Sequence, residues 1–196
     1  MSRSTKKITS VIFYTAFFLI TFKSVWGSSE AFKISNNNDV NFKYDIALVI
    51  FQGKFRIKSS FLNLDEKNPE DSEFSLSFDL PHSSAGFSFA TRVMLGESVL
   101  FAAKYPQIIF RSKEMNFRNG KFEILGDLTV KNITRDLKLI ATPIGFKPEN
   151  FDDKSELHFH IFAEINRHDF GASAFSGLVG SNIVLDSRVT VSRVQN

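Results

Sequence analysis

The segment from Ile165 to Phe175, INRHDFGASAF, places an arginine, a histidine and an aspartate side by side just before a glycine. A histidine beside a carboxylate can act as a general base, but catalysis also needs a nucleophile or a metal ion within reach. The chain contains no G-x-S-x-G pattern of the kind that presents a serine nucleophile. Arg167 and Asp169 can instead fix a corner by hydrogen bonding to exposed backbone groups. We therefore favour a structural corner over a catalytic cluster.

His158 and His160 are a second group that could bind a metal ion, because two imidazoles two positions apart project from the same face of a strand. Such a pair can begin a zinc or copper site, but the site needs one or two further ligands. None of the other histidines stands at a recognisable spacing from this pair. We expect no metal site, no catalytic residue and no cofactor.

The first 27 residues have the layout of a secretory signal peptide. Arg3, Lys6 and Lys7 precede a fifteen-residue apolar run from Ile8 to Phe22, and small residues follow. A helix of that length spans roughly 22 Å, less than the roughly 30 Å hydrocarbon core of a membrane. Cleavage is expected after Gly27, with a second candidate site after Ala31. The mature chain is therefore expected in the periplasm or secreted, without a membrane span.

Charge and composition limit the classes of function open to the remaining chain. Without the four bases of residues 1–27, 20 of the 24 bases remain against 21 acids. This near-neutral balance is not the basic footprint of a nucleic-acid-binding protein. The 23 phenylalanines, against one tryptophan and three tyrosines, favour a large apolar core or cavity, because phenylalanine has no polar group.

Alternation with a period of two dominates the sequence. In SEFSLSFDL, Phe74, Leu76 and Phe78 share one face, and ELHFHIFAEI and NIVLDSRVTVSRV alternate in the same way. This pattern predicts half-buried antiparallel strands, about eight in all. The Asn119–Gly120 pair predicts a tight hairpin, and residues 90–106 predict a short helical insertion. The fold class is all-β, and periodicity alone leaves a sandwich and a barrel open.

Three ordered segments resemble the YceI-like family. INRHDFGASAFSGLVGSNIVLDSRVTV is similar to its C-terminal signature, with an arginine, an aspartate, Phe-Gly and a later Val-Gly. ATRVMLGESVLFAAKYPQIIFRS resembles its arginine, short helix and Tyr-Pro segment, and GDLTVKNITRDLKL resembles one of its hairpins. The resemblance implies an eight-stranded, antiparallel, lipocalin-like barrel over residues 32–196. It also implies an apolar tunnel that holds a polyisoprenoid or quinone-type lipid.

Three positions depart from the family pattern. ISNNNDVNF lacks the histidine of the family's usual Asp-x-x-His-Ser motif, and Val93 replaces a common acidic residue. Both changes affect polar contacts that a lipid head group would make. Asn132 replaces a usual glycine, which is a mild change because asparagine tolerates a left-handed turn.

The strands and the helical insertion supply the predicted lining of the tunnel. Three polar residues, Arg92, Arg167 and Asp169, are predicted to organise the tunnel mouth or a lipid head group. The predicted lipid-binding side chains are Phe74, Phe78, Leu100, Phe101, Phe110, Leu128, Phe159, Ile161, Phe170 and Phe175.

The main hypothesis is thus an exported, non-enzymatic carrier, store or protector of an isoprenoid or quinone-type lipid. One alternative is an enzyme that acts on such a lipid through His158, His160 or His168. Another is a structural or interaction module with an aromatic face on the outside of a filled barrel. The sequence leaves open whether the chain is a monomer or a homodimer.

Overall fold

The structure is a computed structural model that describes residues 30–34, 39–65, 68–145 and 155–194. The predicted signal peptide, 1–27, lies outside the described residues. Cleavage after Gly27 would leave the first strand intact, whereas cleavage after Ala31 would remove two of its residues. Among the described residues, no helix is both long and apolar enough to cross a membrane.

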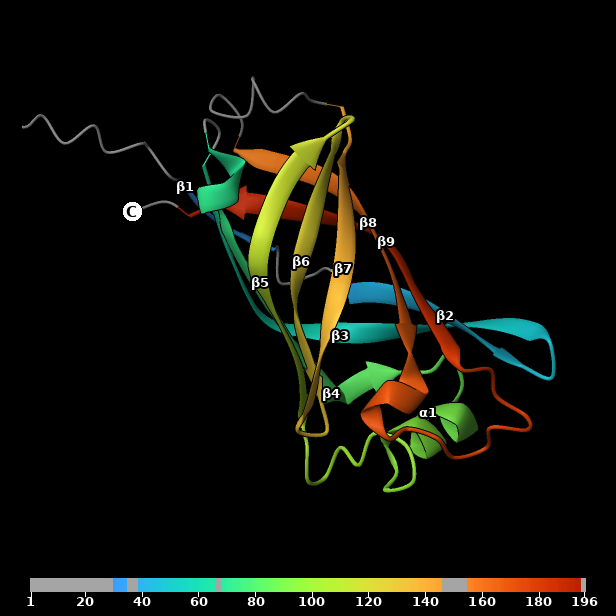
Figure 1. Cartoon of the computed structure of the whole chain (residues 1–196). Coiled ribbons are helices and arrows are strands. Elements are labelled where there is room, and N and C mark those ends of the chain that lie inside the picture. Colours follow the sequence, from blue (N-terminus) through green and yellow to red (C-terminus); the bar gives the residue numbers. More distant parts are fainter. Residues whose placement is uncertain (1–29, 35–38, 66–67, 146–154, 195–196) are drawn as a thin grey trace, which may run out of the picture.

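Antiparallel strands make up most of the described chain (Figure 1). One α-helix, α1 (Ser88–Leu95), follows the fourth strand, and two short 3-10 helices are η1 (Pro69–Asp71) and η3 (Arg167–Phe170). The strands are β1 (Glu30–Ile34), β2 (Asp39–Ile46), β3 (Val49–Leu64), β4 (Glu73–Ser84), β5 (Gln107–Arg118), β6 (Lys121–Val130), β7 (Ile133–Pro143), β8 (Glu156–Asn166) and β9 (Asn182–Arg193).

The strands close into a barrel with eight positions. The order runs from β3 through β2, β9, β8, β7, β6 and β5 to β4, and pairing of β4 with β3 closes the ring. β1 and β2 share one position, because both pair with β3 on one side and β9 on the other. The predicted eight-stranded, antiparallel barrel with a short helical insertion is therefore confirmed.

Two tight turns contain residues whose backbone has positive φ. Asn119 and Gly120 both have positive φ, 52° and 75°, and connect the paired residues Arg118 and Lys121. Lys131 and Asn132 also have positive φ and connect β6 to β7. Two left-handed residues between strands match the twist of a hairpin. The predicted Asn-Gly hairpin is confirmed, and Asn132 occupies the left-handed position that glycine usually fills.

The two ends of the barrel differ. η1 lies at the end where β1 pairs with β3, whereas α1 and η3 lie together at the opposite end (Figure 1). The β2–β3 hairpin extends past the barrel wall on the side of α1. This arrangement places most of the irregular chain, and the space it encloses, at the α1 end.

Inside the barrel, two glycines make room for phenylalanine rings. A Cβ atom on Gly53 would lie 2.2 Å from Cζ of Phe42, its cross-strand partner, and 2.6 Å from the carbonyl oxygen of Ser84. A Cβ atom on Gly126 would lie 2.6 Å from Cζ of Phe110. The rings thus lie directly over backbone that carries no side chain, which increases the packing of the interior.

Gly53→Ala is expected to lower the free energy of unfolding by about 1–3 kcal/mol, because the added methyl displaces the Phe42 ring or the β4 backbone. Gly177→Ala is the control, because a Cβ atom there meets no atom within 4 Å. Urea denaturation of both variants measures the difference. Equal stability of Gly53→Ala and the unmodified protein would contradict the packing described here.

Candidate functional site

A cavity of about 460 Å³ lies at the α1 end of the barrel. It lies where the β2–β3 hairpin, α1 and the segment between η3 and β9 come together. The volume falls within the roughly 300–1,000 Å³ typical of sites that hold a small organic ligand. Six phenylalanine rings contribute to its wall: Phe42, Phe51, Phe55, Phe87, Phe89 and Phe175.

Among the described side chains lining this cavity, only those of Tyr44 and Arg167 carry nitrogen or oxygen atoms. The Tyr44 hydroxyl donates to the backbone carbonyl of Ala85 at 2.7 Å. Burial raises the pKa of Tyr44 above its ordinary value of 10.0. The phenol therefore stays neutral near pH 7, and its hydrogen-bonding capacity is already engaged by the protein.

Arg167 holds the segment that forms one wall of the cavity. Its side chain is buried, with 7% of the residue exposed. Nε donates to the carbonyl of Gly180 and Nη2 to that of Val179, both at 2.8 Å. Nη1 donates to the carbonyls of Ala172 and Ala174. One guanidinium thus binds both ends of the turn between η3 and β9.

Electrostatics at Arg167 reflect this buried position. Burial lowers the pKa of the guanidinium below its ordinary range, and the nearby carboxylate of Asp45 opposes that change. Arginine remains charged in proteins, so the cavity wall contains a cation whose donors point at backbone carbonyls. The arginine therefore acts first as the structural corner that its sequence context indicated.

The cavity reaches the surface at the α1 end. Phe87, Phe89, Phe175 and Leu178 line the cavity and are also exposed, with Phe89 at 68%. Leu48, at the tip of the neighbouring β2–β3 hairpin, is 93% exposed. The apolar wall is therefore continuous with an exposed apolar rim.

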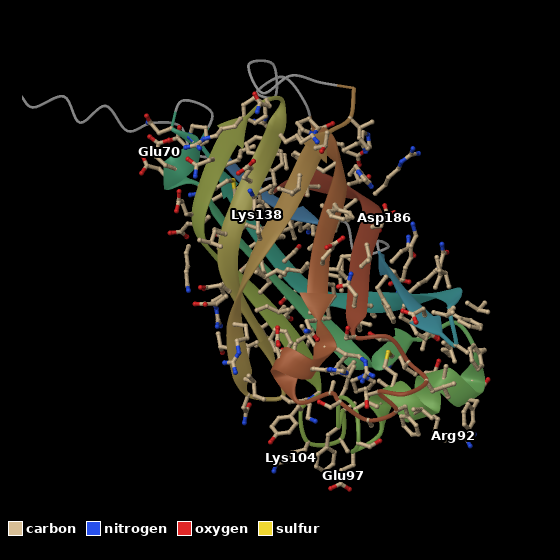
Figure 2. The ribbon with its side chains drawn as sticks, turned by 45° about the vertical axis from the view of Figure 1, so that its right-hand side comes forward. Glu70, Arg92, Glu97, Lys104, Lys138 and Asp186 are labelled. Atoms are coloured by element: carbon tan, nitrogen blue, oxygen red, sulfur yellow. The ribbon has the colours of Figure 1, made fainter. Side chains whose placement is uncertain are left out.

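Charged side chains on α1 and in the loop after it project away from the barrel. Figure 2 shows Arg92, Glu97 and Lys104 pointing outward around α1 and the loop that follows it. Lys104 lies over the rings of Phe101 and Tyr105, 5.9 and 5.3 Å from their centroids. Its charge therefore stays in solvent beside two aromatic rings rather than inside the cavity.

A second, much smaller cavity of about 50 Å³ lies farther along the barrel interior. Its lining includes Leu62 of β3, Phe74 of β4 and Val189 of β9. A cavity that holds one benzene ring measures about 150 Å³. This second space is therefore too small for a lipid chain in the present conformation.

The ten predicted lipid-binding side chains fall into three groups in the structure. Leu100 and Phe175 line the large cavity, while Phe74, Phe159 and Ile161 line the small one. The others line neither cavity, and all but the partly exposed Phe101 are buried in the core: Phe78, Phe101, Phe110, Leu128 and Phe170.

The three predicted head-group residues are also separated. Arg167 lines the large cavity, whereas Arg92 and Asp169 are exposed and line neither cavity. Arg92 projects from α1 away from the barrel in Figure 2. Of the three, the structure thus places only Arg167 where it can contact a molecule inside the cavity.

Sequence reasoning did not select several aromatic residues of the large cavity. These are Phe42 and Tyr44 on β2, and Phe51 and Phe55 on β3. The available signal was the high density of aromatic residues on the two strands of one hairpin, 39–46 and 49–64. Only the closed barrel brings that hairpin against α1.

The histidine pair lies on the outer surface of the barrel. His158 and His160 alternate with Phe159, whose side chain is buried inside. His160 Nε2 is 2.7 Å from Oδ1 of Asp186, and Lys43 Nζ is 2.6 Å from Oδ2. Both hydrogen bonds lower the pKa of Asp186, and the one from Lys43 has the larger effect. Within the described residues, no group of three potential ligands could hold a metal ion.

Comparison with known proteins identifies the family. The family model of the YceI-like domain matches residues 32–192, so the chain belongs to the YceI-like family. Protein YceI of Escherichia coli O157:H7 is 24% identical over 143 residues, which cover 73% of each chain. A UPF0312 protein of Vibrio parahaemolyticus is 27% identical over 108 residues, 54% of this chain and 57% of the relative. The match thus spans little more than half the length of the Vibrio relative.

Solved structures share the fold. BcnA of Burkholderia cenocepacia superposes with a TM-score of 0.69 at 17% identity, covering 79% of this chain and 95% of that one. A polyisoprenoid-binding domain from Saccharophagus degradans superposes with a TM-score of 0.58 at 11% identity, covering 84% and 99%. At these identities the likeness establishes a common barrel.

Arg167→Met is expected to lower the free energy of unfolding by about 3 kcal/mol or more, because it leaves partly buried carbonyls without donors. Arg167→Lys is expected to restore little of that loss, because an ammonium cannot reproduce the planar fork of the guanidinium. Urea denaturation gives both values.

Asp169→Asn is the matched control and is expected to change stability by less than about 0.5 kcal/mol, because Asp169 is exposed. A lysine variant as stable as the unmodified protein would contradict the clamping role of Arg167.

Proposed function

We propose that this protein is a binding protein that holds an isoprenoid or quinone-type lipid, with the isoprenoid tail in the 460 Å³ cavity at the α1 end. The observation that carries the proposal is the wall of this cavity. Of the described side chains in that wall, only Tyr44 and Arg167 bring nitrogen or oxygen atoms, and both already bind backbone carbonyls. Such a wall favours an apolar ligand over a polar one. The polyisoprenoid-binding domain of Saccharophagus degradans, which shares the barrel, adds support.

Burial of hydrocarbon supplies enough free energy for this function. Each buried methylene contributes about 0.8 kcal/mol. Ten such groups give roughly 8 kcal/mol before association and chain ordering offset several kcal/mol. A net value of about 8 kcal/mol corresponds to micromolar affinity, so a tail somewhat longer than ten carbons suffices.

Binding, rather than catalysis, is the role that we assign to this site. His158 and His160 project from the outer face of β8, opposite the inward side chains that line the small cavity. Neither histidine lines the large cavity. We further propose export to the periplasm or the cell exterior, which rests on the signal-peptide pattern of residues 1–27.

Ala90→Phe tests the cavity as the binding site. Ala90 is buried on α1 and lines the cavity, so the larger side chain fills space that the lipid would occupy. Retention of farnesol after gel filtration, quantified by gas chromatography, is expected to fall at least tenfold. The free energy of unfolding is expected to change by less than about 1.5 kcal/mol, because the ring enters existing space.

Ala103→Phe makes the same substitution at an exposed position outside the cavity and is expected to retain farnesol normally. Equal retention of farnesol by the Ala90→Phe variant and the unmodified protein would contradict the proposed site.

A further inference from the structure

The interior of the barrel is divided rather than continuous. On β4, Phe74 and Leu76 line the small cavity, and Ala85, directly after the strand, lines the large one. Phe78 lies between them along the chain and lines neither cavity. Along β9, Leu185 occupies the equivalent place between Val189 and Ile183. An intervening layer of buried side chains therefore separates the two cavities.

Three stacked or tilted aromatic rings form the centre of this layer. The rings of Phe42 and Phe55 stack with centroids 4.3 Å apart, and those of Phe55 and Phe78 lie 5.4 Å apart. Phe42 and Phe55 face the large cavity, and Phe78 lies behind them. We call Phe42, Phe55 and Phe78 the aromatic floor. They extend across three consecutive strands of the barrel, β2, β3 and β4.

The backbone beneath the floor restrains its position. The Phe42 ring lies directly over Gly53, where a Cβ atom would approach it to 2.2 Å. All three rings are buried, with 3% of Phe42, 8% of Phe55 and 3% of Phe78 exposed. Rings packed on both sides move only if their neighbours move with them, so a ligand tail meets a fixed surface here.

We propose that the aromatic floor sets the length of the isoprenoid tail that this protein accepts. The inference rests on the proposed function, because it concerns the same cavity. A cavity of about 150 Å³ holds the six carbons of benzene, so 460 Å³ accommodates about eighteen carbons. That size matches a farnesyl or geranylgeranyl tail. A longer tail must either leave part of its length in water or displace the floor.

Phe78→Ala tests the floor. The Phe78 ring lines neither cavity, and its removal is expected to join the two spaces. The measurement is the affinity of the purified mature protein for geraniol, farnesol, geranylgeraniol and solanesol. In the unmodified protein, affinity is expected to rise up to farnesol or geranylgeraniol and then to level off or fall. In Phe78→Ala, affinity for solanesol is expected to rise at least tenfold, while affinity for farnesol changes less than threefold.

Met115→Ala is the matched control. Met115 lines only the small cavity, so its truncation enlarges interior space without breaching the floor. It is expected to leave the length preference unchanged. Phe78→Leu is a milder second variant that keeps the core filled if the alanine variant does not fold, and it is expected to raise affinity for solanesol at least threefold.

Two results would overturn the length rule while leaving lipid binding intact. One is solanesol binding more tightly than farnesol and geranylgeraniol in the unmodified protein. The other is an unchanged length preference in folded variants at Phe78. Failure of the unmodified protein to bind any of the four alcohols would instead overturn the proposed function itself.

Discussion

Closure of the barrel by the pairing of β3 with β4 is the constraint on which the rest of the structure depends. Once the ring closes, every second side chain of each strand must point inward, and the interior has to be apolar. Phenylalanine rings, such as those of Phe42 and Phe110, fill part of that interior. Gly53 and Gly126 then become necessary, because only strand positions without a side chain allow rings to lie so close to the backbone.

The cavity exists because this packing is interrupted at one end. There the β2–β3 hairpin extends past the barrel wall, and α1 and the turn between η3 and β9 cover its inner face. The ring of Phe51 on the hairpin lies 5.6 Å from that of Phe87 at the start of α1. Arg167 fixes the remaining wall through backbone carbonyls. A charged residue thus maintains a space whose surface is otherwise almost entirely apolar.

Much of this fold could be predicted from the sequence, because alternation specifies which strand face is buried. Phe78 and Phe159 are buried as their segments indicate, and His158 projects from the opposite face. The position of the cavity could not be predicted in this way. Whether an inward phenylalanine lines a cavity or fills the core depends on neighbours that are distant in sequence, as Phe42 depends on Gly53 and Phe55. The same limit applies to Arg167 and Asp169, because the Arg-x-Asp spacing does not reveal which side chain turns inward.

We propose above all that the cavity at the α1 end holds an isoprenoid tail. The most direct measurement is mass spectrometry of an organic extract of the protein, expressed as the full chain and purified from a bacterial periplasm without detergent. We expect about one isoprenoid or quinone-type lipid per barrel, retained through purification. An extract free of such lipids, both directly and after incubation of the protein with farnesol and a short-chain quinone, would contradict it.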